Sequence, residues 1–217
     1  SDHGVAQRRG VEAGVEQDPA AVDLAQHARH RLAQATVGIA AAGGARLCKL
    51  EADSATLPSA IFYDFEAHRA RFGRDGIQHY IEGTDGRLLR SLKSVLGSSL
   101  IDDVTLIQRK RVALRDVIGL FLRHLKSLAE REAGRPIDSV VLGRPVRFVD
   151  HDDDADRRAE TELVNIAKAQ GFRHVETQFE PVAAALAYER ELGREELSLI
   201  VDLGGGTSDF VVARLSP

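Results

Sequence analysis

Helical and strand-like patterns alternate along the second half of this 217-residue chain, and their order constrains the fold more than any other feature. Apolar residues recur at helical spacing over 104–132, and Gly134 and Pro136 are expected to end that helix. The segments after it are predicted as strand, helix, strand, helix and strand, over 139–145, 152–171, 174–179, 181–193 and 197–203. This alternation predicts an α/β fold built in layers.

The first half of the chain has a different pattern. Short apolar runs begin at Thr36 and are separated by Gly43 and Gly44 and by a polar stretch, which predicts a small antiparallel β-meander. Residues 65–108 mix apolar and polar positions, and we expect an irregular insert there. Residues 1–35, rich in Ala, Arg, Gln, Gly and His, predict an N-terminal segment that is disordered or weakly helical.

The composition excludes several classes of protein. Hydrophobic residues make up 43% of the chain and charged residues 29%, which suits a folded core and not a disordered chain. The net charge of −4 argues against a general nucleic-acid binder, and no apolar run approaches the roughly 20 residues of a membrane span. The single cysteine, Cys48, excludes an internal disulfide and fits a reducing compartment, so we expect a cytoplasmic protein.

The stretch 201–210, VDLGGGTSDF, places three glycines directly after a predicted strand. A second strand is expected after them, so the glycines form the turn of a hairpin and not the strand-to-helix turn of a dinucleotide fingerprint. No Gly-Lys-Ser/Thr follows, which excludes a Walker loop. The backbone N–H groups of Gly204, Gly205 and Gly206 can approach phosphate oxygens closely. The alternative is an ordinary hairpin with a flexible tip.

Residues with side-chain oxygens flank these glycines. Thr207 adds a hydroxyl, and Asp202 and Asp209 add carboxylates that can hold Mg²⁺ through its waters. The hairpin therefore predicts a phosphate and magnesium site. A second acidic stretch, HDDDAD over 151–156, shows no ligand spacing and is predicted to cap a helix N-terminus with negative charge.

VDLGGGTSDF resembles the second phosphate loop of the actin-like ATPases, above all the 70-kDa heat-shock (DnaK-like) chaperones. Two further stretches resemble the same family at the family's spacing, VVLGRPVRF over 140–148 and FEPVAAALAYE over 179–189. Three motifs in order are far more specific than any one of them. The form LGRP, in place of the family's usual VP form, points to the divergent YegD-like subgroup.

The resemblance covers roughly 36–217 and implies an incomplete actin-like ATPase fold, which is ribonuclease H-like. Residues 36–195 would form the first lobe of a nucleotide-binding domain, with the insert at 65–108. Residues 196–217 would start the second lobe with its phosphate-binding hairpin. ATP and Mg are the cofactors that the resemblance implies.

The family's site residues carry over onto the hairpin. The resemblance implies that Gly204, Gly205, Gly206 and Thr207 contact the phosphates, with Thr207 also counted among the catalytic residues. Asp202 would lie near Mg²⁺ and take part in catalysis.

Two more catalytic residues are implied outside the hairpin. Glu180 would orient a water, while the alternative is a carboxylate that only favours the start of a helix beside Pro181. Lys93, in SLKSVLG, resembles a family lysine that reaches the γ-phosphate and offsets charge as the bond breaks. The alternative for Lys93 is a solvated surface lysine.

Some family features have no match in this sequence. No Gly-Thr turn precedes Thr36 where the first phosphate loop would lie, and no stretch matches the adenosine-binding segment. We therefore expect a truncated chaperone ATPase domain with weak or absent hydrolysis. Its expected partners are nucleotide and, through unmatched regions, unfolded clients or co-chaperones. The alternatives are a small-molecule kinase or filament protein of the same superfamily, or an inactive fragment that acts as an interaction module.

Overall fold

The computed structural model of the chain describes residues 33–41, 44–96, 98–189, 192–203 and 208–216. By its contacts the chain divides into two units, 1–30 and 31–217, and only the second contains described residues. The N-terminal segment predicted over 1–35 therefore lies outside the described residues, except where the first strand, β1, spans Gln34–Thr36.

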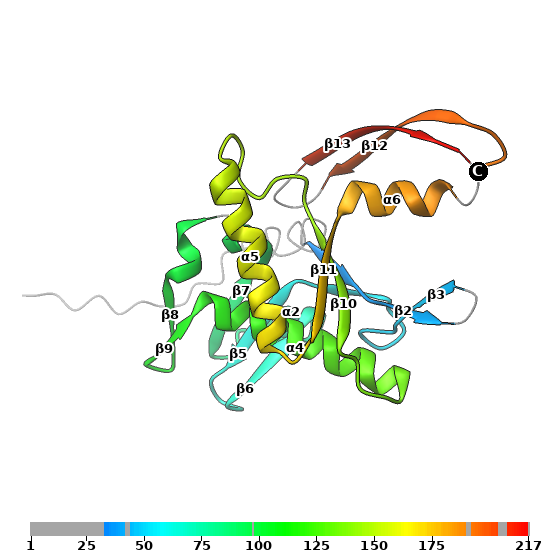
Figure 1. Cartoon of the computed structure of the whole chain (residues 1–217). Coiled ribbons are helices and arrows are strands. Elements are labelled where there is room, and N and C mark those ends of the chain that lie inside the picture. The colour runs from blue at the N-terminus through cyan, green and yellow to red at the C-terminus, as the bar shows by residue number, and fades with distance from the viewer. Residues whose placement is uncertain (1–32, 42–43, 97, 190–191, 204–207, 217) are drawn as a thin grey trace, which may run out of the picture. The chain divides into compact units, whose positions relative to one another are not determined.

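The second unit begins with short antiparallel strands (Figure 1). β2 (Gly38–Ala41) pairs antiparallel with β3 (Gly44–Leu47), as expected, but the second glycine of the predicted separator is already the first residue of β3. β4 (Thr56–Pro58) returns to pair with β1. A three-stranded sheet follows, with β5 (Ala60–Asp64) between β6 (Arg69–Phe72) and β7 (Gly86–Arg90). The helix α2 (Gly73–Ile81) packs mainly on the central strand of this sheet.

The segment predicted as an irregular insert, 65–108, contains more regular structure than its mixed pattern indicates. After β7 come three further short elements, α3 (Leu92–Leu96), the 3-10 helix η1 (Ser99–Asp102) and β8 (Val104–Ile107). Each of them has four or five residues, which is too short for a hydrophobic period to show in the sequence.

The helix predicted over 104–132 begins only at Leu114, so the prediction was wrong for 104–113. That stretch forms an antiparallel hairpin of β8 with β9 (Lys110–Ala113). Its turn residues, Gln108 and Arg109, are left-handed with φ of 46° and 65°. Side chains along β8 alternate between exposed and buried, which is the period of a strand. The helix itself, α4 (Leu114–Ala133), ends at a left-handed Gly134, as predicted.

The alternation predicted for the second half is confirmed. Its elements are β10 (Ser139–Arg144), α5 (Asp153–Ala169), β11 (His174–Phe179), α6 (Glu180–Glu189), β12 (Glu196–Leu203) and β13 (Ser208–Leu215). β10 and β11 are parallel, with α5 as the connection that parallel strands require. β12 and β13 are antiparallel, as predicted for a hairpin around the glycines, and α6 packs along both (Figure 1).

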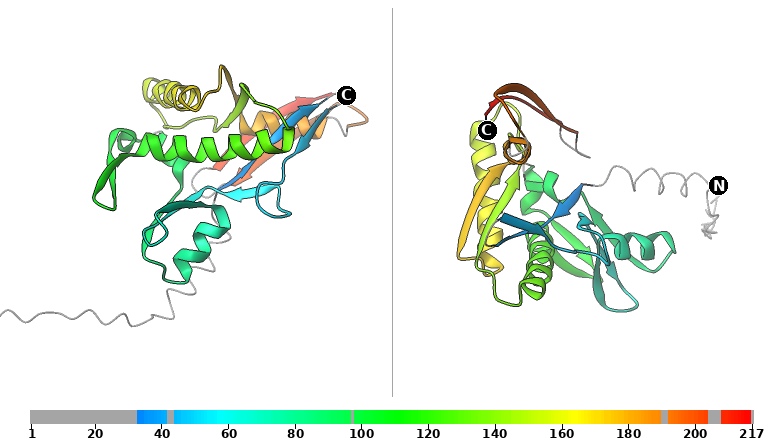
Figure 2. Two further views of the ribbon diagram at one scale, coloured as in Figure 1. Left: turned by 90° about the horizontal axis from the view of Figure 1, so that it is seen from below. Right: turned by 90° about the vertical axis from the view of Figure 1, so that its right-hand side faces the viewer.

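The helices α4 and α5 pack against each other and close the core (Figure 2). A Cβ at Gly119 would lie 2.7 Å from Nε2 of Gln170, so a larger residue there would make this side chain move. Buried side chains from both helices and from β4 and β5 form one cluster, which includes Val117, Phe121, Leu163, Leu57 and Ile61. Each such side chain contributes about 1.5–3 kcal/mol on burial. No helix among the described residues is long and apolar enough to cross a membrane.

The turn between β8 and β9 gives a direct test of the hairpin. Replacing Arg109 with glycine should raise the free energy of unfolding by about 1 kcal/mol, because a residue with a Cβ is strained at φ of 65°. Urea unfolding of Arg109→Gly measures the change. The control is Arg111→Gly within β9, which should lower stability. A helix over 104–113 would be weakened by both substitutions alike.

Candidate functional site

The carboxyl ends of β10 and β11 define the candidate site. The two strands run parallel and in register, with Arg144 opposite Phe179 at their last residues. Glu180 follows Phe179 directly and is the first residue of α6. Ligands in open α/β sheets bind outside the carboxyl ends of the strands, so this edge is where a site is expected.

Lys93 and Glu180 form an ion pair at this edge. The Nζ atom of Lys93, on α3, donates to Oε1 of Glu180, although 87 positions separate the two residues in the sequence. The Lys93 side chain is 36% exposed and that of Glu180 is 30% exposed, so solvent reaches both. The structure thus brings together the two catalytic residues that were predicted outside the glycine hairpin.

Gly143 makes room for the Glu180 side chain. A Cβ placed at Gly143 would lie 3.2 Å from Cγ and 3.3 Å from Oε1 of Glu180. These distances are tighter than ordinary van der Waals contacts, so any larger residue there would push the carboxylate aside. The glycine therefore lets the Glu180 side chain lie close to the end of β10.

Arg144, the next residue, is a buried arginine with several partners. Its side chain is 5% exposed and binds Asp156 at 2.7 Å and Glu160 at 2.6 Å, both on α5. Its Nε also donates to the Pro145 carbonyl oxygen at 3.1 Å. The two carboxylates and the carbonyl oxygen offset the free-energy cost of removing the guanidinium from water. Arg144 thereby ties the end of β10 to the first turns of α5.

The acidic stretch over 151–156 begins α5, as predicted. Asp152 is the N-cap residue and accepts a hydrogen bond from the Ala155 amide. Asp153 pairs with Arg147, and the hydrogen bond from that guanidinium holds the pKa of the carboxyl below its usual value. Asp154 pairs with Arg157 on the surface. The stretch thus caps a helix and joins ion pairs, which accounts for its charge.

Asp156 is the member of this stretch that faces inward. Burial raises the pKa of its carboxyl, but hydrogen bonds from the Phe148 amide and the Arg144 guanidinium outweigh burial and leave the pKa below its usual value. The carboxylate is therefore charged at neutral pH, and its charge supports the buried arginine.

The glycine hairpin is described only in part. Gly204, Gly205, Gly206 and Thr207 lie outside the described residues. The strands that flank them are described, and their register places Asp202 directly opposite Asp209. The roles predicted for these residues in phosphate and magnesium binding stay predictions.

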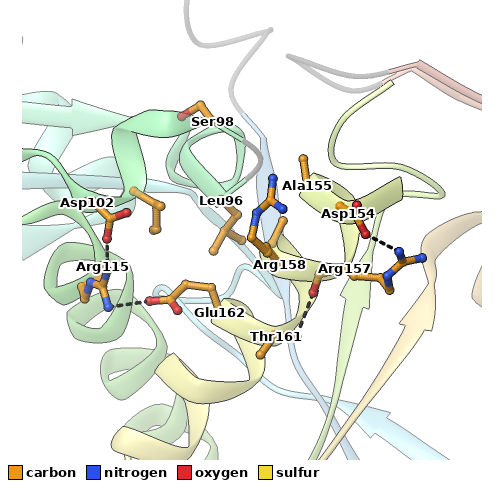
Figure 3. Close-up of a pocket in the computed structure, with 12 residues that line it drawn as sticks. Leu96, Ser98, Asp102, Arg115, Asp154, Ala155, Arg157, Arg158, Thr161 and Glu162 are labelled. Atoms are coloured by element: carbon orange, nitrogen blue, oxygen red, sulfur yellow. Dashed lines mark hydrogen bonds and ion pairs between the residues drawn. The ribbon is translucent and has the colours of Figure 1, made fainter. Parts of the chain in front are cut away.

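A groove of about 610 Å³ lies elsewhere, between α3, η1, α4 and α5 (Figure 3). Arg115 lies at one end of it and pairs with Asp102 of η1 and with Glu162 of α5. Arg157 and Arg158 of α5 line it from the opposite wall, with Leu96 between. Neither Lys93 nor Glu180 lines this groove, so it is separate from the candidate site.

Sequence reasoning missed two residues of the site, Gly143 and Arg144. Both stand in the LGRP stretch, where the sequence shows an arginine between a buried strand and a proline. An arginine in such a place needs acidic partners, and the pair Asp156 and Glu160, four residues apart on one helix face, could have indicated them.

Comparison with known proteins identifies the family. A family model described as Hsp70 protein matches residues 97–216, more than half of the chain. The chain belongs to the Hsp70 family. This match confirms the fold class predicted from the sequence, an α/β lobe of the actin-like ATPase type. Glu180 and the glycine hairpin lie within the matched range, while Lys93 lies just before it.

Curated relatives are chaperones. The chaperone protein HscA of Pectobacterium atrosepticum is 32% identical over 180 residues, which cover 74% of this chain and 27% of that protein. An HscA homolog of Actinobacillus pleuropneumoniae serotype 5b is 36% identical over 101 residues, which cover 46% of this chain and 15% of that protein. An HscA homolog of Mannheimia succiniciproducens is 34% identical over 109 residues, which cover 50% of this chain and 17% of that protein. This Hsp70-family chain thus spans about a quarter, or less, of the length of these relatives.

The Arg144 ion pairs predict a pH-dependent loss of stability. Asp156→Asn should lower the free energy of unfolding by about 2 kcal/mol at pH 7, because it leaves a buried guanidinium short of one carboxylate. Folding lowers the pKa of Asp156, so its ionised carboxylate stabilises the folded protein. This contribution is complete when the pH is above the unfolded pKa of about 3.9, and it is lost as the pH falls through the pKa of the folded state.

Urea unfolding from pH 7 to pH 3 checks this prediction. The difference between wild type and Asp156→Asn should be constant above about pH 5 and shrink below about pH 4. Asp154→Asn, at an exposed position of the same helix turn, is the matched control and should change stability much less. A difference that stays constant down to pH 3 would show that the ionised Asp156 carboxylate contributes nothing to stability.

Proposed function

We propose that this chain forms one side of an ATP- and Mg²⁺-binding site of an Hsp70-type chaperone, whose ATP hydrolysis drives protein folding. The observation that carries the proposal is the pairing of Lys93 with Glu180 at the carboxyl ends of β10 and β11. A cation suits a phosphate oxygen, and a carboxylate suits the water that attacks it. Membership of the Hsp70 family supports the same assignment.

Lys93 and Glu180 have complementary tasks in this proposal. Lys93 binds the γ-phosphate and offsets the charge that develops as the bond breaks. Glu180 accepts a hydrogen bond from the attacking water and orients it. In the structure each neutralises the other, and because both are partly exposed, the exchange of partners needs little desolvation.

The hairpin residues supply the other half of the proposed site. Their donor set fits Mg²⁺, because Asp202 and Asp209 stand at directly opposite register positions and aspartate supplies the oxygen ligands that the ion prefers. Acidic residues at opposite positions of an antiparallel pair repel each other. When bound, Mg²⁺ supplies positive charge that offsets this repulsion and that of the phosphates. The amides of Gly204 to Gly206 and the hydroxyl of Thr207 hold the phosphate oxygens.

We further propose that these 217 residues, assayed by themselves, hydrolyse ATP slowly or not at all. No stretch of this sequence matches the family's first phosphate loop or its adenosine-binding segment. The LGRP stretch supports the YegD-like subgroup, and the single cysteine supports a cytoplasmic location. Unfolded clients and co-chaperones are the partners proposed for the whole protein.

The chaperone assignment is favoured over the two alternatives. The HscA relatives and the Hsp70 family match argue against a small-molecule kinase or a filament protein of the actin type. An inactive interaction module would have no need to bring Lys93 and Glu180 together from distant parts of the chain. A measurement of nucleotide binding distinguishes the two, because an inactive module is expected to bind none.

The role of Lys93 predicts a difference between ATP and ADP. Lys93→Met should weaken binding of ATP·Mg²⁺ about tenfold, because a charged contact to the γ-phosphate is lost. Binding of ADP·Mg²⁺, which lacks that phosphate, should change little. Isothermal titration of the full chain measures both affinities, and Lys110→Met, on the exposed end of β9, is the control. Equal losses for both nucleotides, or no ATP binding by the wild type at millimolar concentration, would contradict the proposal.

Slow hydrolysis is tested by steady-state turnover. The full chain should release phosphate from ATP·Mg²⁺ far more slowly than intact HscA of Pectobacterium atrosepticum, measured side by side. Glu180→Gln corrects for contaminating ATPase, because it removes the carboxylate that orients the water. Turnover equal to that of the intact relative, and abolished by Glu180→Gln, would refute slow hydrolysis by these 217 residues while supporting the site.

A further inference from the structure

Arg144 stands out among the buried groups of the described residues. The buried polar or charged residues there are Asp64, Thr105 and Arg144. Asp64 is paired with Arg71 and caps a local turn at the Ala67 amide, both within one hairpin. Arg144 instead joins elements that lie far apart in the sequence, since its partners come from β11 and α5 and from the loop between β10 and α5.

The guanidinium of Arg144 is held from several directions. Asp156 and Glu160 bind its two terminal nitrogens, and the Pro145 carbonyl oxygen binds Nε. Glu160 is itself fixed, because it accepts a hydrogen bond from the hydroxyl of Thr177 on β11. A guanidinium whose two terminal nitrogens each donate to a different carboxylate has little freedom to reorient. Arg144 is thus a rigid point at the end of β10.

Two aromatic rings lie against this rigid point. The Cζ atom of Arg144 is 5.0 Å from the ring centroid of Phe148 and 5.0 Å from that of Phe179. Both distances are within the roughly 6 Å range of a cation–π contact. Phe179 is 39% exposed, so burial holds its ring less firmly than it holds a core side chain. The contact with Arg144 is therefore one of the interactions that orient the ring of Phe179.

Glu180 is joined to residues on both sides of the contact between Arg144 and Phe179. It follows Phe179 directly, and its side chain lies against Gly143, which precedes Arg144. The Glu180 side chain therefore lies against the residue that precedes Arg144, and its backbone directly follows the residue whose ring lies against Arg144.

We propose that Arg144 is a positioning residue for Glu180, acting through the ring of Phe179 to hold the start of α6 where Glu180 meets Lys93. What Glu180 does with a nucleotide rests on the proposed function, but where Glu180 lies does not. Phe148 lies at the same distance from this guanidinium without being joined to α6, so it provides a matched control.

Chemical labelling of Lys93 in the full chain, without nucleotide, tests the proposal. Acetic anhydride modifies lysine amines, and an amine paired with a carboxylate reacts slowly. Mass spectrometry gives the labelling rate of Lys93 relative to Lys126, which binds carbonyl oxygens of Gln170 and Gly171 away from the site. Phe179→Leu should raise this ratio about threefold, which is the scale of a lost cation–π contact. Phe148→Leu should leave the ratio unchanged, and Phe179→Tyr, which keeps a ring, should restore it.

The other outcomes contradict the proposal. A ratio unchanged in Phe179→Leu, or raised equally in Phe148→Leu, would show that Arg144 only anchors α5 to the strands. A Phe179→Leu chain that fails to fold, as judged by circular dichroism, would show that the ring holds the fold and not Glu180. Because no nucleotide is present, a labelling result that contradicts the role of Arg144 does not contradict the proposed ATP site. Conversely, a chain that binds no ATP can still show the labelling pattern expected for Arg144.

Discussion

Parallel strands leave their carboxyl ends at one edge of a sheet, and β10 and β11 end there in the same register, at Arg144 and Phe179. The residue after each strand, Pro145 or Glu180, leaves the sheet at this edge. A slip of one residue would move Glu180 by about 3.3 Å and turn every side chain of β11 to the other face. The site therefore depends on this register, which α5 maintains because it packs on β11 and is bound to Arg144.

The sequence predicted the second half of the fold well because its elements leave strong signals. Long amphipathic helices and buried strands show their periods over many residues, and Gly134 marked the end of α4 correctly. The prediction failed at 104–113, where two four-residue strands have apolar residues that also suit a helix. Their turn uses Gln108 and Arg109 in place of the asparagine and glycine that usually announce such a turn.

The candidate site was predictable to a different extent for each residue. Glu180 and Lys93 were found through the family resemblance, since no local period brings together positions so far apart. Gly143 escaped because its importance is a contact with Glu180 that only the folded chain creates. Arg144 escaped because in a strand pattern an arginine suggests an exposed position, and its partners on α5 override that expectation.

The two groups of ion pairs at this edge differ in how easily they can change partner. The pair of Lys93 with Glu180 is about one-third exposed on both sides, and pairs of this kind contribute only about 0–1 kcal/mol. The Arg144 side chain is 5% exposed and has two carboxylate partners, so breaking either contact would leave a buried charge partly unpaired. The structure thus separates a fixed network, which holds strands and helix together, from an exchangeable pair. In the ATP site proposed above, this separation lets Lys93 move to an incoming phosphate without loosening the strands that carry Glu180.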